Sequence, residues 1–160
     1  MDTLLLLLQR DARAPHVDLA AQLGTTVEDI AQRIAAYERD GTILSYRAVI
    51  DAEKIANGIV QAVIEVRLAP EREGGFDRVA ERIAKFDQVQ ACYLMSGGYD
   101  LLVFIEAKTL REVAAFVTEK LSPLGGILST ATRFRLKTYK ENGAMLTESG
   151  HGAGKLSVAP

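Results

Sequence analysis

The sequence predicts an α+β fold, in which an N-terminal helix-turn-helix unit is joined by a linker strand to a ferredoxin-like βαββαβ domain. Three observations predict it. The first 41 residues carry the apolar period of amphipathic helices. Residues 59–68 alternate between apolar and polar side chains, as a half-buried strand does. From there to residue 141, strand and helix patterns follow in the order β-α-β-β-α-β. The expected parts are residues 1–41 (helices), 42–58 (linker strand or hinge), 59–141 (sheet domain) and 142–160 (a Gly- and Ser-rich flexible tail).

Composition places the chain among ordinary globular proteins. It is 48% hydrophobic and 25% charged, with a net charge of −2. The single cysteine, Cys92, excludes an intramolecular disulfide and fits a small core residue in a reducing compartment. The leucine run Leu4–Leu8 is too short for a signal peptide, and no apolar run approaches the roughly 18 residues of a membrane span. We therefore expect a cytoplasmic protein without membrane contact.

Two short helices and a longer one are predicted in the N-terminal unit. The first covers Leu4 to Gln9. In the second, "VDLAAQLG", Asp18 is a candidate N-cap and Gly24 a natural terminator. The turn of about four residues around Gly24 gives helix-turn-helix spacing, although other small helical domains share that spacing.

The third helix is predicted in "TTVEDIAQRIAAYERDG", with Gly41 as its end. Both Thr26-x-x-Asp29 and Thr25-x-x-Glu28 fit a capping box. One face of the 3.6-residue period carries the apolar side chains Val27, Ile30, Ile34 and Tyr37.

In a helix-turn-helix, the N-terminal residues of the second helix of the motif reach base edges in the major groove. Gln32 is a candidate base reader, and Arg33 is a candidate phosphate contact unless it pairs with Asp29 or packs on Tyr37. Glu28 can accept a hydrogen bond from cytosine, but capping is the more ordinary role of acids at this end of a helix. The full set of candidate DNA-binding residues is Thr25, Thr26, Glu28, Gln32, Arg33 and Arg39.

The charge of the N-terminal unit predicts weak DNA binding by a single copy. Residues 1–50 contain five arginines against seven acidic residues. Phosphate neutralisation by Lys and Arg supplies most non-specific affinity, so this unit has little of it. Two or more linked copies recover affinity through effective concentration.

The sheet domain is predicted from alternating strand and helix patterns. "IVQAVIEVRL" is the first strand, and the stripe through Phe76, Val79, Ile83 and Phe86 marks a helix. A hairpin follows at about 89–96 and 100–107, then a helix at 110–121 and a last alternating strand in "STATRFRLKTY". Both helices should cover one sheet face. The hairpin strands are apolar on nearly every residue, which indicates burial on both faces, so a second copy should cover the other face.

The hairpin "CYLMSGGYDLLVFI" raises the question of what Asp100 does at the start of an apolar strand. Gly97-Gly98 suits a tight turn. Asp100 can bond amides of its own turn, or it can be the polar group of a binding site. The sequence alone leaves both roles open.

Several motifs in order resemble the Lrp/AsnC family of bacterial and archaeal transcription regulators. The segment "IAQRIAAYERDGTILSYRAVID" is similar to the family's V-x-x-R-V-x-x-L-E-x-x-G-x-I-x-x-Y-x-A, with Tyr37 in place of Leu. "SGGYDLL" is similar to its T-G-x-Y-D hairpin, and "GILSTATRFRLKTYK" to its final strand. The motifs extend from Leu4 to Lys140, nearly the whole chain.

The resemblance implies a regulator that binds double-stranded DNA and responds to a small effector, typically an amino acid. The C-terminal domain of the family, called RAM, dimerises and often assembles further, to tetramers or octamers, with the effector in a cleft between dimers. Asp100 would accept from its ammonium, Gly97 and Gly98 would allow close approach, and hydroxyls would meet its carboxylate. The implied effector residues are Ser96, Gly97, Gly98, Tyr99, Asp100, Ser129, Thr130 and Thr132.

Two other functions fit the pattern. A RAM-type sensor or assembly protein with weak or lost DNA binding would explain the acidic third helix. A sirohaem-decarboxylase-like enzyme shares the two-part architecture, but the only histidines, His16 and His151, are placed far from the hairpin in the sequence. There is no Cys/His cluster for zinc and no phosphate loop. We therefore expect no catalytic residues, metal or cofactor.

Overall fold

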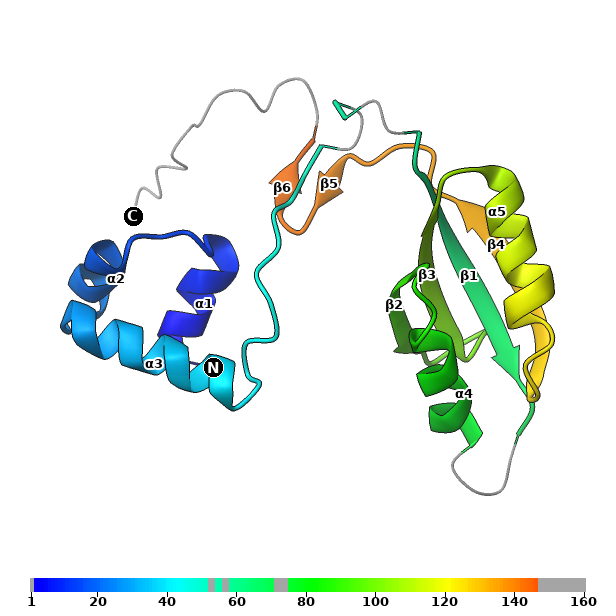
Figure 1. Cartoon of the computed structure of the whole chain (residues 1–160), viewed down its shortest axis with the longest axis horizontal. Coiled ribbons are helices and arrows are strands. Elements are labelled where there is room, and N and C mark those ends of the chain that lie inside the picture. Colours follow the sequence, from blue (N-terminus) through cyan, green and yellow to red (C-terminus); the bar gives the residue numbers. More distant parts are fainter. Residues whose placement is uncertain (1, 52–53, 56–57, 71–74, 147–160) are drawn as a thin grey trace. The chain divides into compact units, whose positions relative to one another are not determined.

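The computed structural model describes residues 2–51, 54–55, 58–70 and 75–146 (Figure 1). The chain divides into two compact units, the first ending at Ile50 and the second beginning at Asp51. The division falls inside the linker predicted at 42–58. None of the helices in the described ranges has the length and apolar character to cross a membrane.

Three helices form the first unit, as predicted: α1 (Thr3–Arg10), α2 (His16–Leu23) and α3 (Val27–Arg39). The prediction of Asp18 as an N-cap is wrong, because α2 begins at His16 with Pro15 in the cap position. The fixed φ of proline suits a helix start, so the helix opens three residues earlier. The core of this unit consists of Leu4, Leu8, Leu19, Ala20, Ile30 and Ile34.

Local capping explains where α2 ends and α3 begins. Gly24 closes α2 in the left-handed conformation, with φ 65°, as predicted. Thr26 is the N-cap of α3, and its hydroxyl accepts from the amide of Asp29 at 3.1 Å. The Thr25 hydroxyl donates to the Asp29 carboxylate at 2.9 Å. The structure therefore uses Thr26 as the N-cap, whereas the Asp29 carboxylate bonds the Thr25 hydroxyl instead of the Thr26 amide that would complete a capping box.

The linker strand predicted after α3 is not formed in the part of 42–58 that the structure describes. Residues 44–51 have no strand pairing. A strand needs a partner for its backbone groups, and neither unit supplies one here. Leu44 is 88% exposed and Ile50 57% exposed, so this segment keeps apolar side chains in solvent in the single chain.

The second unit is the predicted four-stranded antiparallel sheet with two helical segments. Its strands lie in the order β2-β3-β1-β4, the arrangement of a ferredoxin-like fold. The elements are β1 (Val60–Leu68), α4 (Gly75–Ala84), β2 (Val89–Leu94), β3 (Leu101–Ala107), α5 (Leu110–Ala115) with its π-helical continuation η1 (Phe116–Leu121), and β4 (Ile127–Phe134).

One face of this sheet forms the core with the helices. Alternate residues of β1 and β3, such as Ile64 and Val103, pack with Ile83 of α4 and with Val113 and Phe116 of the α5–η1 segment. Figure 1 shows α4 and α5 beside the sheet. The opposite face, which we call the open face, has no element of the described unit packed over it and carries the half-buried residues Val63, Leu102 and Phe104.

A short hairpin follows β4 where the sequence predicted the start of a flexible tail. It pairs β5 (Lys140–Glu141) with β6 (Ala144–Met145). Asn142 and Gly143 have φ of 45° and 86°, the left-handed values that an Asn-Gly type I′ turn needs. The Arg135 guanidinium donates to Glu141 at 3.0 Å. The rest of the predicted tail, 147–160, lies outside the described residues, as does His151.

Candidate functional site

Asp100 connects the hairpin turn to the neighbouring strand. Its Oδ2 atom accepts from the backbone amide of Leu68 at 2.7 Å. Its own amide donates to the carbonyl of Val66 at 2.9 Å, and its carbonyl accepts from Met95 at 2.8 Å. The carboxylate thus takes the place of a strand carbonyl at the end of the β1–β3 ladder. The amide that it bonds lies 32 residues away, not in its own turn.

Arg67 secures the same turn from β1. Its Nε atom donates to the carbonyl of Gly98 at 2.7 Å. Arg67 is not among the effector residues predicted from the sequence. The alternation was the available signal, because it places Arg67 opposite the buried side of β1.

The three β4 hydroxyls do not lie on one face. Ser129 pairs with Arg67, whereas Thr130 pairs with Val66 and Thr132 with Ile64. Directly opposite residues of an antiparallel pair share a sheet face. Thr130 and Thr132 are therefore half-buried on the helix-covered side, and Ser129 is exposed on the open face. One ligand on the open face can meet only Ser129 of the three.

An ion pair crosses the open face next to this turn. Arg133 Nε and Nη2 donate to the two oxygens of Glu65 at 2.8 and 3.2 Å. These hydrogen bonds lower the pKa of the Glu65 carboxyl. The Glu65 contact raises the pKa of Arg133.

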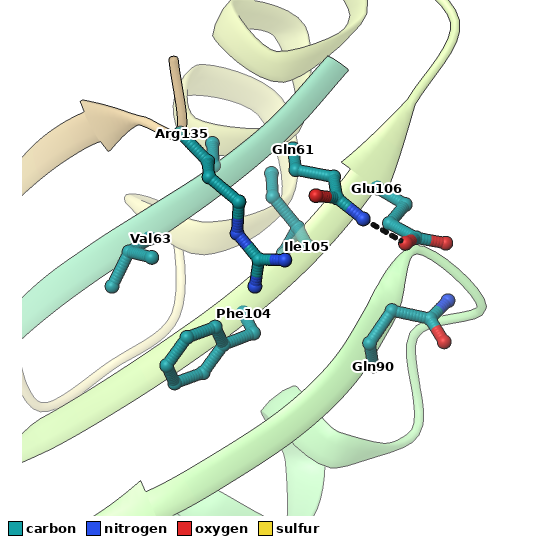
Figure 2. A pocket seen from close by; sticks show the side chains of 8 residues that line it. Gln61, Val63, Gln90, Phe104, Ile105, Glu106 and Arg135 are labelled. Atoms are coloured by element: carbon teal, nitrogen blue, oxygen red, sulfur yellow. Dashed lines mark hydrogen bonds between the residues drawn. The ribbon is translucent and has the colours of Figure 1, made fainter. Parts of the chain in front are cut away.

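A small hollow lies at the other end of the open face (Figure 2). Gln61 donates to the carboxylate of Glu106 at 2.7 Å, and Gln90 also lines the hollow. Figure 2 shows the Arg135 side chain extending over the sheet beside Phe104. Because Gln61 lies near the start of β1 and Glu106 near the end of β3, this hollow is distant along the strands from the hairpin turn.

Cys92 lies half-buried on the helix-covered side of β2. Burial raises the pKa of its thiol, which disfavours the reactive thiolate. Among the residues described, no cluster of three His, Cys, Asp or Glu side chains is arranged to hold a metal ion. His16 opens α2 in the first unit.

The candidate DNA-binding residues fall into three groups on and before α3. Thr25 and Thr26 use their hydroxyls in the helix cap. Glu28, Gln32 and Arg39 are exposed.

Arg33, the third case, is already paired. Its Nη2 atom donates to both carboxylate oxygens of Asp2 at 2.8 and 2.7 Å, and Tyr37 donates its hydroxyl to the same carboxylate. Asp29 lies 3.6 Å from the guanidinium. Asp2 is also the N-cap of α1, so this cluster ties the start of α1 to the middle of α3.

Removing the negative charge of Asp2 should lower the free energy of unfolding at neutral pH, and the size of this loss should depend on pH. Hydrogen bonds from Tyr37 and Arg33 lower the pKa of Asp2 from 3.8 to about 2. A depressed carboxyl pKa stabilises the fold above pH 3.8, and the contribution is lost as the pH falls towards 2. Asp2→Asn keeps a good N-cap, so we expect a loss of about 1 kcal/mol in the free energy of unfolding at neutral pH.

Chemical denaturation of Asp2→Asn and wild type across this pH range checks the prediction. The difference between the two proteins should shrink as the pH falls. Asp18→Asn, at an exposed position of α2, is the matched control. A difference that stays constant with pH would refute the ion-pair explanation.

Comparisons with known proteins match both units. Residues 3–38 match the AsnC-type helix-turn-helix domain, and residues 61–145 match the Lrp/AsnC ligand binding domain. An uncharacterized HTH-type transcriptional regulator of Bacillus subtilis, YugG, is 39% identical over 96% of this chain and 93% of its own length. The leucine-responsive regulatory protein of Haemophilus influenzae is 24% identical over 84% of this chain and 80% of its own.

Solved structures show the same fold. A Neisseria meningitidis transcriptional regulator in complex with L-Met superposes with a TM-score of 0.68, at 23% identity, over 88% of this chain and 93% of its own. An AsnC family transcriptional regulator from Agrobacterium tumefaciens gives a TM-score of 0.67, at 27% identity, over 88% and 94%.

Proposed function

The chain belongs to the Lrp/AsnC family of transcription regulators, and we propose that it binds double-stranded DNA through α3 and an amino-acid effector at the hairpin turn. The observation that carries the effector half is the position of Asp100, whose carboxylate stands at the end of β1 with one oxygen bonded to the Leu68 amide. The other oxygen has no partner among the residues described. It is placed to accept from an ammonium group.

The amino-acid class of the effector is supported by the relatives. The Neisseria regulator was solved with L-Met, as was a feast or famine regulatory protein of M. tuberculosis. We propose an amino acid for this chain on the same grounds, at the turn formed by Ser96, Gly97, Gly98, Tyr99 and Asp100 with Ser129 beside it. Thr130 and Thr132 face the helices and contribute by packing β4 rather than by contacting the ligand.

A second copy of the chain is part of the proposal. The open face of the sheet carries half-buried apolar residues, including Val63, Leu102 and Phe104. A face of this kind is ordinarily packed against another layer. We propose that two copies pack by their open faces and that dimers assemble further, to tetramers or octamers. Such a cytoplasmic assembly would bring several weakly binding reading units to one stretch of DNA.

On α3, the proposed base reader is Gln32, which is exposed and can bond adenine in the major groove. It is flanked by Glu28, Arg39 and the cap residues Thr25 and Thr26. Arg33 can contact a DNA phosphate only if it gives up its ion pair with Asp2. Gln32→Ala should therefore weaken specific DNA binding by roughly 10- to 100-fold, the value of one bidentate base contact. The thermal stability of the Gln32→Ala variant should equal that of wild type.

Fluorescence anisotropy on a labelled fragment from upstream of the protein's own gene measures the effect. Gln9→Ala, an exposed glutamine of α1, should bind like wild type. Equal affinity of Gln32→Ala and wild type would remove Gln32 from the reading surface.

A second function is favoured by one observation. The first turn of α3 carries Glu28 and Asp29, which repel phosphate. A RAM-type sensor that has weak or lost DNA binding would show effector binding without specific DNA binding. The same anisotropy experiment, combined with calorimetry of amino-acid binding, separates the two functions.

A further inference from the structure

Arg67 lies where the parts of the proposed effector site meet. Its Nε atom donates to the Gly98 carbonyl of the turn at 2.7 Å, and it stands opposite Ser129 on β4. The next residue, Leu68, gives its amide to Asp100 at 2.7 Å. Two consecutive residues of β1 therefore place opposite charges at the same end of the sheet. Arg67 carries the positive charge, and Leu68 binds the carboxylate of Asp100.

The guanidinium of Arg67 still has donors to offer. Arginine has five N–H donors, and in the described part of the chain only Nε is engaged. Arg33, Arg133 and Arg135 differ, because each pairs with a carboxylate. Arg67 is exposed and bonds the Gly98 carbonyl, and it forms no ion pair with a carboxylate of the residues that the structure describes.

The turn itself adds unused donors. The backbone amides of Gly97 and Gly98 donate to no acceptor among the residues that the structure describes. Successive free amides in a turn favour an anion, and the absence of Cβ atoms at both glycines leaves the backbone accessible. The guanidinium and the turn amides therefore favour the same kind of ligand group, a carboxylate.

We propose that Arg67 binds the α-carboxylate of the effector while Asp100 binds its ammonium group, so that the site selects zwitterionic α-amino acids. Ser129, on the same face as Arg67, adds a hydroxyl to the carboxylate. This inference rests on the proposed function, since it assumes an effector at the hairpin turn. It replaces Thr130 and Thr132 by Arg67 as the group that recognises the carboxylate.

A thermodynamic cycle separates carboxylate binding from a merely structural role of Arg67. Calorimetry on the full-length protein first identifies which of the twenty standard L-amino acids binds most tightly. The same amino acid and its α-amide, which lacks the carboxylate charge, are then titrated into wild type and Arg67→Met. Arg111→Met, at an exposed position of α5 in the same unit, is the control for the lost charge.

We expect Arg67→Met to weaken binding of the amino acid by roughly 10- to 100-fold and to leave binding of the α-amide unchanged. Arg111→Met should match wild type for both. If Arg67 only positions the turn, Arg67→Met will weaken both ligands equally, which overturns the inference and keeps the proposed function. Unchanged binding of both ligands overturns it as well. If no amino acid binds wild type, the proposed effector is wrong, and the inference falls with it.

Discussion

Replacing Asp100 by asparagine should weaken effector binding by roughly 10- to 100-fold without unfolding the protein. The amide oxygen of asparagine can still accept from the Leu68 amide, which Asp100 bonds at 2.7 Å. The negative charge that pairs with the effector's ammonium is lost, and charge-assisted hydrogen bonds are the stronger kind. Calorimetric titration with the tightest-binding amino acid measures the change.

Two further variants make this result specific. Asp100→Ala removes the acceptor for Leu68 as well, so it should lower the melting temperature in addition to the affinity. Asp87→Asn, an exposed acid in the α4–β2 connection, should bind the effector as wild type does. If Asp100→Asn retained wild-type affinity, Asp100 would be only a structural link between the turn and β1.

Phe104→Glu should separate the proposed dimer into monomers and reduce DNA affinity by about 100-fold or more. Phe104 lies on the open face in β3, and its ring meets that of Tyr93 edge-on, with centroids 5.9 Å apart. An unpaired charge buried in an interface costs about 3–5 kcal/mol. A single reading unit, with more acidic than basic residues in its first 50 positions, should then hold DNA poorly.

Sedimentation equilibrium gives the mass of the variant, and anisotropy gives its DNA affinity. Leu110→Glu places the same charge at an exposed position at the start of α5 and should stay oligomeric. A Phe104→Glu protein of unchanged mass would show that copies do not meet through the open face.

Much of the fold can be predicted from local patterns in the sequence. The alternation in β1 placed Ile64 and Val66 in the core because strand side chains alternate by geometry alone. Gly24 and Thr26 cap their helices by bonds to residues a few positions away. Interactions of this range can be predicted from the order of residues.

The remaining features depend on distant or external partners. Arg33 bonds Asp2, which is 31 residues away in the sequence, and Asp100 bonds Leu68, which is 32 residues away. No local pattern therefore predicts either bond. The linker residues 44–51 have a strand-like composition but no pairing, because a strand forms only where a neighbouring strand is present. The Asn-Gly pair of the β5–β6 hairpin is a turn signal, but the Gly-rich composition around it favoured the prediction of a flexible tail.

The most direct test of the central claim is anisotropy of the wild-type protein on its own upstream DNA, titrated with salt and repeated with each of the twenty amino acids. The claim predicts specific binding that weakens steeply with salt and that one amino acid shifts by roughly 5- to 150-fold, the usual range of allosteric coupling. Binding that is absent, indifferent to DNA sequence, or unchanged by every amino acid would contradict it.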